Sequence, residues 1–176
     1  MKIKSMKFGK RALIILLIFL IACGGIYFGM NKIQQVVPAF ANQDNNLVIV
    51  LDAGHGGMDG GCSTADGVPE KGINLNILLT LRDMLTAAGY KVEVTRDTDT
   101  SIHDDGIEGL ANQKKSDMDN RLAKFNKNPN AICISIHQNL FTDSKYSGAQ
   151  MFYSDTNPES KYLAQMLQDQ FVEYLQ

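Results

Sequence analysis

The stretch LVIVLDAGHGGMDGG, Leu47–Gly61, decides the fold of this chain. Its apolar half holds consecutive β-branched residues without alternation, which is typical of a strand covered on both faces in an α/β sheet. Asp52 and His55 follow this strand, and ligands of open α/β sheets bind outside the carboxyl ends of the strands. We therefore expect a site at His55, where five glycines let the backbone pass close to an ion or substrate: Gly54, Gly56, Gly57, Gly60 and Gly61.

Neither the glycines nor the charge of the chain favours a nucleotide or nucleic-acid ligand. The spacing departs from G-x-G-x-x-G because position 59 is aspartate, and the Gly-Lys-Ser/Thr ending of a P-loop is missing. The only charged residues before residue 42 are six basic ones, so the rest of the 176-residue chain holds 11 basic against 19 acidic side chains. An acidic domain is a poor match for a phosphate backbone, and we expect no nucleic-acid partner.

The N-terminal part predicts export of the rest of the chain. Residues 1–11 are a basic cytoplasmic region, and residues 12–30 follow without a single charge, which is long enough to span a bilayer as a helix. A signal peptide cleaved after Ala39-Phe40-Ala41 and a lipoprotein anchored through Cys23 are the alternatives. All three interpretations place the following domain outside the cytoplasm.

Residues 31–46 have the composition of a linker, and residues 47–176 form the predicted domain. The chain is 44% hydrophobic, enough for one domain with its own core. Its three cysteines are too few for a disulfide framework, so Cys23 and Cys133 are predicted to be buried free thiols, with a Cys62–Cys133 disulfide as the alternative.

The pattern after the glycine loop predicts a βαβ unit with a right-handed crossover. A helix is expected from Glu70 to about Gly89, followed by a strand at Tyr90–Thr95. The carboxylate of Glu70 then lies in the first helical turn, where it complements the helix dipole. The residues expected on the inner face of the helix are Ile73, Ile77, Leu78, Leu81, Met84 and Leu85.

Residues 96–115 are polar and without period, and His103 within them is interpreted as a loop histidine. A short helix is predicted to open at Ser116 with Asp119 as its capping-box partner, and to end near Asn128-Pro129. Its expected inward residues are Met118, Leu122 and Phe125.

A second buried strand is expected at Ala131–Ile136, and His137 follows its carboxyl end as His55 follows the first strand. A strand at Gln150–Ser154 and a last helix from Asn157-Pro158 are also expected. The fold class is therefore an α/β three-layer sandwich with a mostly parallel central sheet flanked by helices. The helical pattern still runs at Gln176, so we expect the sequence to be cut short at its C-terminus.

Two histidines and one glutamate could meet at this edge of the sheet. Two imidazoles and a carboxylate are a set typical of catalytic zinc, with the fourth position open to water. Spacing alone is weak support, because the two histidines of such a chain could be unrelated. Within the same sequence, Ser135 and Cys62 lack the surroundings of a nucleophile.

The sequence segments around these residues resemble those of the zinc-dependent N-acetylmuramoyl-L-alanine amidases. The matching pieces are VIVLDAGHGGMDGG (48–61), Glu70-Lys71 followed by Asn74-Leu75 and LRDMLTAAGYKVEVTRDTD (81–99), and ISIHQN (134–139). SDMDNRLAKFNKNPNAICISIHQN and KYSGAQMFYS are most similar to the sporulation and germination branch, which trims spore-cortex peptidoglycan. The resemblance implies that His55, Glu70 and His137 bind Zn²⁺, and that Asp52 and Asn139 lie behind the ligands or contact substrate.

The resemblance also implies a second glutamate, in an E-C-G-F-like segment, as general base. No such segment occurs up to Gln176, and the role is not transferred to Glu173, so the catalytic glutamate is expected beyond the given sequence. The expected activity is hydrolysis of the amide between the lactyl group of N-acetylmuramic acid and L-alanine in peptidoglycan, outside the cytoplasm of a Gram-positive-type bacterium. A non-catalytic peptidoglycan-binding protein and a zinc carboxypeptidase are the alternatives.

Overall fold

The computed structural model of the chain describes residues 21, 24, 47–141 and 148–175. These residues divide into two compact units, Met1–Gln138 and Asn139–Gln176. Most of the expected membrane or signal segment and the whole expected linker lie outside the described residues. Within the part that is described, no helix combines the length and the apolar character that crossing a bilayer requires.

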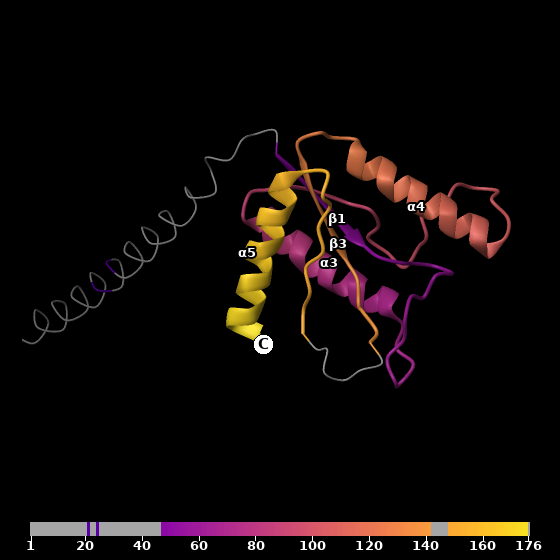
Figure 1. Cartoon of the computed structure of the whole chain (residues 1–176), viewed down its shortest axis with the longest axis horizontal. Coiled ribbons are helices and arrows are strands. Elements are labelled where there is room, and N and C mark those ends of the chain that lie inside the picture. The colour runs from indigo at the N-terminus through magenta and orange to yellow at the C-terminus, as the bar shows by residue number, and fades with distance from the viewer. Residues whose placement is uncertain (1–20, 22–23, 25–46, 142–147, 176) are drawn as a thin grey trace, which may run out of the picture. The chain divides into compact units, whose positions relative to one another are not determined.

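The sheet of the first unit has three parallel strands in the order β2-β1-β3, with β1 (Val48–Ala53) in the centre. All six residues of β1 are buried, as the unbroken apolar run predicts. β2 (Lys91–Val94) and β3 (Ala131–Ile136) flank it, and β1 and β3 are labelled in Figure 1. Ala53 pairs with Ile136, so β1 and β3 end side by side and the residues that follow them lie at one edge of the sheet.

Helix α3 (Glu70–Ala87) connects β1 to β2 and confirms the predicted βαβ unit. Its inner face differs from the prediction, because Ile77 and Met84 are 44% and 66% exposed. The buried residues are Glu70, Asn74 and Leu78, four apart along one stripe, since two polar side chains turn inward near the end of β1. Leu78 packs against β1 in a core that also includes Leu75, Leu79, Leu81, Leu85, Tyr90, Val92, Val94, Ile134 and Ile136.

Helix α4 (Leu110–Asn126) begins six residues before the predicted start at Ser116. The capping-box prediction is therefore wrong: Gly109 precedes the helix with φ 82°, and the Ser116 hydroxyl donates to Asp104. The predicted inward residues Met118 and Leu122 are 69% and 57% exposed. Polar residues take the inner face of α4 instead, and its buried residue is Arg121.

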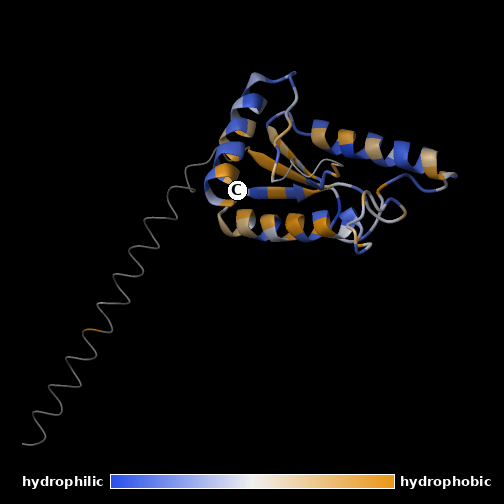
Figure 2. Cartoon of the chain, turned by 60° about the horizontal axis from the view of Figure 1, so that its bottom comes forward, coloured by the Kyte–Doolittle hydropathy of each residue, from blue (hydrophilic) through white to orange (hydrophobic). Residues whose placement is uncertain are grey.

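Helices lie on both faces of the sheet. Ile49, Leu51 and Ala53 of β1 pack on the α3 side, and Asp52, which points to the other side, pairs with Arg121 of α4. Figure 2 shows α3 and α4 along opposite sides of the strands. The structure thus supports an α/β arrangement with a parallel sheet between helices.

The second unit contains α5 (Pro158–Leu175), which opens at Asn157-Pro158 as predicted. The Asn157 Oδ1 accepts from the amide of Glu159, and a proline fits the first helical position. The strand predicted at Gln150–Ser154 is not formed. Within this unit, the Gln168 side chain accepts a hydrogen bond from the Met151 amide. In a sheet, that backbone N–H would instead donate to a neighbouring strand.

Both described cysteines, Cys62 and Cys133, are free and exposed, so no disulfide joins them and the predicted burial of Cys133 is wrong. Cys23 lies outside the described residues. Cys62 lies in the loop before α3, and Cys133 lies in β3, whose residues alternate between partly buried and exposed. β3 is therefore half-covered, unlike the fully buried strand that its apolar sequence predicts.

Candidate metal centre

The three predicted ligands meet at the carboxyl edge of the sheet. His55 Nε2 lies 3.3 Å from Glu70 Oε1, and His137 Nδ1 lies 3.0 Å from the same oxygen. The two imidazole rings are 4.9 Å apart at their centroids and stand at 80° to each other. One ligand atom from each residue lies within 4.8 Å of the others, so the three side chains could hold a metal ion together.

His55 takes its position from an unusual backbone conformation. Its φ is 64°, in the left-handed region that non-glycine residues rarely adopt, and Gly56 and Gly57 continue with φ 139° and 56°. The His55 carbonyl accepts a hydrogen bond of 2.8 Å from the Arg121 guanidinium. A residue in this region costs about 1–3 kcal/mol unless its surroundings hold it, and this bond is part of that support.

Glu70 stands at the first position of α3, because loop carbonyls bind the amides of the helix start. The amide of Glu70 donates to Cys62 O at 2.8 Å, and the amide of Lys71 donates to Gly60 O at 3.1 Å. The helix therefore begins where the loop closes on it. Its first side chain points toward the edge of the sheet rather than serving only as a complement to the helix dipole.

The carboxylate of Glu70 is only 3% exposed and is surrounded by donors. Oε1 accepts from the Gln138 amide at 2.9 Å and from Asn74 Nδ2 at 3.1 Å, and Oε2 accepts from the Cys62 amide at 3.0 Å. Burial alone would raise the pKa of Glu70, but these hydrogen bonds and the charge of His55 hold that pKa at about 2. Glu70 is thus an anion at neutral pH.

His137 follows β3 and lies against the backbone of the first loop. A Cβ on Gly54 would come closer than 3.0 Å to three atoms of its imidazole, a separation that real Cβ atoms essentially never show. Gly54 therefore makes room for the ring. The His137 side chain is 49% exposed, so the candidate centre is open to solvent on this side.

Asp59 is the outer partner of His55. Its Oδ2 lies 2.8 Å from His55 Nδ1, and its Oδ1 lies 2.7 Å from the ammonium of Lys114 on α4. Burial alone would raise the pKa of Asp59, but the hydrogen bonds from Lys114 and His55 hold that pKa at about 2. A carboxylate on the second nitrogen of a ligand histidine is a recurrent feature of metal centres.

The other predicted positions differ in where they lie. Asp52 is buried, and its carboxylate binds Thr95, Ser135 and Arg121. It reaches the candidate centre through Arg121, which also binds the His55 carbonyl. Asn139 is exposed and begins the second unit, and its predicted role stays a prediction. His103 pairs with Ser101 in the loop before α4, as the loop interpretation expects.

The donor set fits a divalent metal of the zinc type. Neutral imidazole nitrogens and an ionised carboxylate are ordinary zinc ligands, and three protein ligands with an open side are typical of catalytic rather than structural sites. The outer partners also fit, because Asp59 binds the second ring nitrogen of His55 and Asn74 donates to the Glu70 carboxylate. Bound zinc would lower the pKa of a coordinated water and polarise a carbonyl group.

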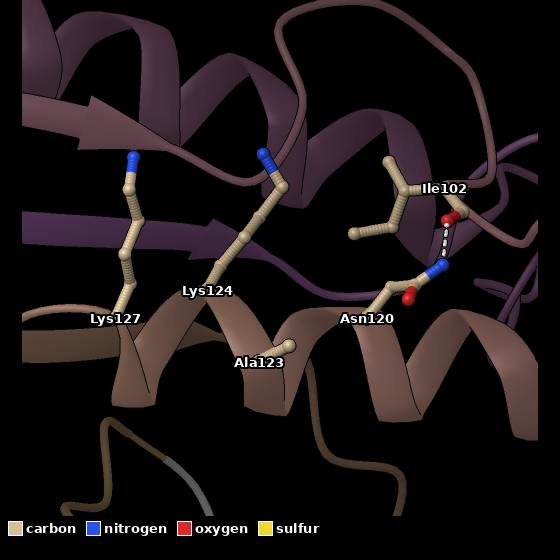
Figure 3. Close-up of a pocket in the computed structure, with 5 residues that line it drawn as sticks. All are labelled: Ile102, Asn120, Ala123, Lys124 and Lys127. Carbon is tan, nitrogen blue, oxygen red and sulfur yellow. Dashed lines mark hydrogen bonds between the residues drawn. The ribbon is translucent and has the colours of Figure 1, made fainter.

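A cavity of about 370 Å³ lies elsewhere, between α4 and the loop that precedes it (Figure 3). Its lining includes Lys124 and Lys127, whose side chains point to the same side of α4, and Asn120, which donates to Ile102 O at 2.8 Å. None of the three candidate ligands lines it. Two surface lysines and an amide that is already bound offer no catalytic group there.

Sequence reasoning missed several residues that support the centre. Asn74 lies within the matching segment, four positions after Glu70 on the same helical face, but neither its burial nor its bond to Glu70 was predicted. Asp59 is the only carboxylate inside the glycine loop, and this gives a weaker indication of its role than the helical spacing gives for Asn74. Arg96 and Arg121 gave no signal, since arginines are normally exposed. Arg96 donates to Ala53 O, Gly54 O and Lys71 O, and so fastens the loop to α3.

Comparison with known proteins adds independent information. The family model described as N-acetylmuramoyl-L-alanine amidase matches residues 49–176. The germination-specific N-acetylmuramoyl-L-alanine amidase of Bacillus subtilis is 36% identical over 123 residues, covering 70% of this chain and 52% of that protein. The AmiC amidase of Escherichia coli is 33% identical over 133 residues, covering 73% of this chain and 28% of that protein.

Among solved structures, the CwlD amidase from Clostridioides difficile, in complex with the GerS lipoprotein, aligns with a TM-score of 0.66 and 37% identity. The alignment covers 72% of this chain and 65% of that one. The chain thus spans about half the length of the Bacillus subtilis relative and about two thirds of the solved one.

Proposed function

Because the chain belongs to the N-acetylmuramoyl-L-alanine amidase family, we propose that it hydrolyses the amide between the lactyl group of N-acetylmuramic acid and L-alanine in peptidoglycan. We further propose that the reaction uses zinc held by His55, Glu70 and His137. The observation that carries this proposal is the convergence of their three ligand atoms within 4.8 Å at the edge of the sheet.

Zinc held here would supply an activated water and an electrophile for the scissile carbonyl. The residues of the chain would hold and orient it. Glu70 brings a negative charge that three donors keep ionised, and its burial keeps competing solvent away. The exposed side of His137 leaves room for an extended glycan or peptide to approach. The predicted proton-transferring glutamate is not assigned to any of the described residues.

The finer assignments are part of the same proposal. Similarity to a germination-specific amidase supports a role in sporulation or germination, with spore-cortex peptidoglycan as substrate. Peptidoglycan lies outside the cytoplasm, which agrees with an N-terminal membrane or signal segment at residues 12–30 and a linker at residues 31–46. The domain from residue 47 is proposed to be a three-layer sandwich, supported by the helices on both faces of its sheet.

Product analysis tests this function. The zinc-loaded protein is incubated with purified peptidoglycan, and the soluble products are examined by mass spectrometry. We expect whole stem peptides with a free L-alanine amino group. Release of a terminal amino acid would indicate the carboxypeptidase alternative, and retention on peptidoglycan without release would indicate the binding alternative. Either result contradicts the proposed amidase.

The close approach of Gly54 to His137 gives a second test of the centre. The variant Gly54→Ala should push the imidazole out of place and weaken zinc binding by about 10-fold or more, with a stability loss of about 1–3 kcal/mol from overpacking. Gly60→Ala is the matched control, because its added Cβ would meet Pro69 only at 3.8 Å, an ordinary contact. Competition with a chromophoric chelator measures both; equal zinc affinities would contradict the packing argument.

A further inference from the structure

A short chain of contacts joins helix α4 to the back of the candidate centre. The ammonium of Lys114 lies 2.7 Å from Asp59 Oδ1, and Asp59 Oδ2 lies 2.8 Å from His55 Nδ1. The backbone of Asp59 is fixed independently, because its amide and carbonyl bind the carbonyl and amide of Gly56 at 3.1 and 2.9 Å. The position of residue 59 therefore does not depend on its side chain alone.

The geometry of these contacts favours one proton arrangement for a neutral imidazole. Both ring nitrogens of His55 face a carboxylate, and a carboxylate only accepts hydrogen bonds. Only the contact with Asp59, at 2.8 Å, has hydrogen-bond geometry, whereas Glu70 Oε1 lies farther away at 3.3 Å, so the proton of a neutral ring sits on Nδ1 and points to Asp59. The lone pair is then on Nε2, which faces Glu70 at 3.3 Å. That is the tautomer in which His55 can bind a metal beside Glu70.

We propose that Asp59 is a positioning residue that fixes the metal-binding tautomer of His55, and that Lys114 determines which atom of residue 59 faces the imidazole. This inference rests on the proposed metal centre. It means that Lys114, which is not a ligand and lies on α4 rather than on the helix of Glu70, influences zinc binding by His55. The role of Lys114 follows from its being a donor without acceptor capacity.

An asparagine at position 59 makes the proposal testable. Lys114 can bind only the carbonyl oxygen of the new amide, so the amide NH₂ group is turned toward His55 Nδ1. Nδ1 must then accept a hydrogen bond, so the ring proton moves to Nε2. A protonated Nε2 has no lone pair to bind the metal. Without Lys114 the amide is free to rotate and to offer its oxygen to Nδ1–H. Asp59→Asn should therefore be harmful mainly when Lys114 is present.

The experiment uses the full chain at about pH 8, where free imidazole is neutral. Two-dimensional ¹H–¹⁵N NMR of the zinc-free protein reports which His55 nitrogen carries the proton, and chelator competition gives the zinc dissociation constant. We expect Nδ1–H in the original protein. In Asp59→Asn we expect Nε2–H and a dissociation constant raised about 10–100-fold. In the Asp59→Asn/Lys114→Met double variant we expect Nδ1–H and substantial recovery of zinc affinity.

Asp99→Asn is the matched control. Asp99 also accepts from the glycine loop, at 2.9 Å from the Gly57 amide, and pairs with Lys71 at 2.7 Å, but it does not contact a ligand histidine. The same loss of one charge there should leave the tautomer of His55 unchanged and the zinc affinity within about 3-fold, below the loss typical of an outer partner.

The inference is overturned by Nε2–H in the original protein, by Nδ1–H in Asp59→Asn, or by equal zinc affinities in Asp59→Asn and the double variant. Its failure is distinguishable from failure of the proposed function. The tautomers are read without zinc, whereas a lack of zinc binding by the original protein would contradict the metal centre itself.

Discussion

Replacing His55 or His137 by alanine is expected to abolish stoichiometric zinc binding. Each imidazole supplies one of three ligand atoms, and the remaining pair would be a carboxylate and a single nitrogen. Losing an outer partner typically costs 10–100-fold in metal affinity, so losing a ligand should cost more than about 100-fold. The zinc content after dialysis should fall from one ion per chain to a small fraction of one.

The third histidine of the chain provides the control. His103 lies in the loop before α4 and pairs with Ser101, away from the three ligands. His103→Ala should keep one zinc per chain, as measured by atomic emission on protein of known concentration. If both ligand variants also kept one zinc per chain, the ligand assignment would be wrong.

Amide hydrolysis should follow the metal. Because activation of water would depend on bound zinc, the ligand variants should release stem peptides no faster than chelator-treated protein does. The same variants should retain their far-ultraviolet circular dichroism, since neither histidine is part of the buried core. Activity with unchanged rate in a zinc-free variant would contradict the proposed mechanism.

The sequence predicted the part of the centre that depends on strand ends. β1 and β3 were recognisable as apolar runs, and parallel strands that end in register bring the following residues to one edge. His55 and His137 therefore meet for a reason that a single sequence contains. Glu70 was recognisable as a first-turn carboxylate, and the resemblance to a known family supplied its role.

Other features were not predictable, because they depend on polar residues that turn inward. Asn74 takes a buried position on α3, so the apolar face is rotated and Ile77 becomes exposed. On α4 the inner face is formed by Arg121 and Asp117, and a hydrophobic pattern assigns such residues to solvent. The partner that explains the burial of Arg121 is Asp52, 69 positions earlier, and no local pattern connects the two.

Arg121 is therefore the residue whose loss should destabilise the fold most. It is 8% exposed and binds Asp52 and Asp117, and it donates at 2.8 Å to the carbonyls of Ala53 and His55. Arg121→Met would leave the Asp52 carboxylate buried beside two hydroxyl donors, without its cation. Removing one partner of a buried ion pair costs about 3–5 kcal/mol, and we expect a loss of this size in urea unfolding.

An exposed ion pair on the same helix is the matched control. Lys115 and Asp119 are 3.0 Å apart with side chains 78% and 63% exposed, so Lys115→Met should cost less than about 0.5 kcal/mol. If Arg121→Met does not fold, Arg121→Lys can be measured instead. It keeps the charge but loses the planar guanidinium that binds several acceptors, so its loss of unfolding free energy should lie between that of Lys115→Met and the value expected for Arg121→Met. A loss below about 1 kcal/mol in Arg121→Met would contradict the prediction.

A double variant separates the orphaned charge from the lost carbonyl bonds. Asp52→Asn removes the charge that Arg121→Met leaves behind, so the two changes together should cost clearly less than their sum. The remaining loss would reflect the carbonyls of Ala53 and His55 together with the Asp117 carboxylate, which also loses its partner. Because His55 is held at φ 64° partly by this bond, zinc affinity should stay reduced in the double variant even where stability recovers. Full recovery of both would mean that Arg121 supports the fold through Asp52 alone.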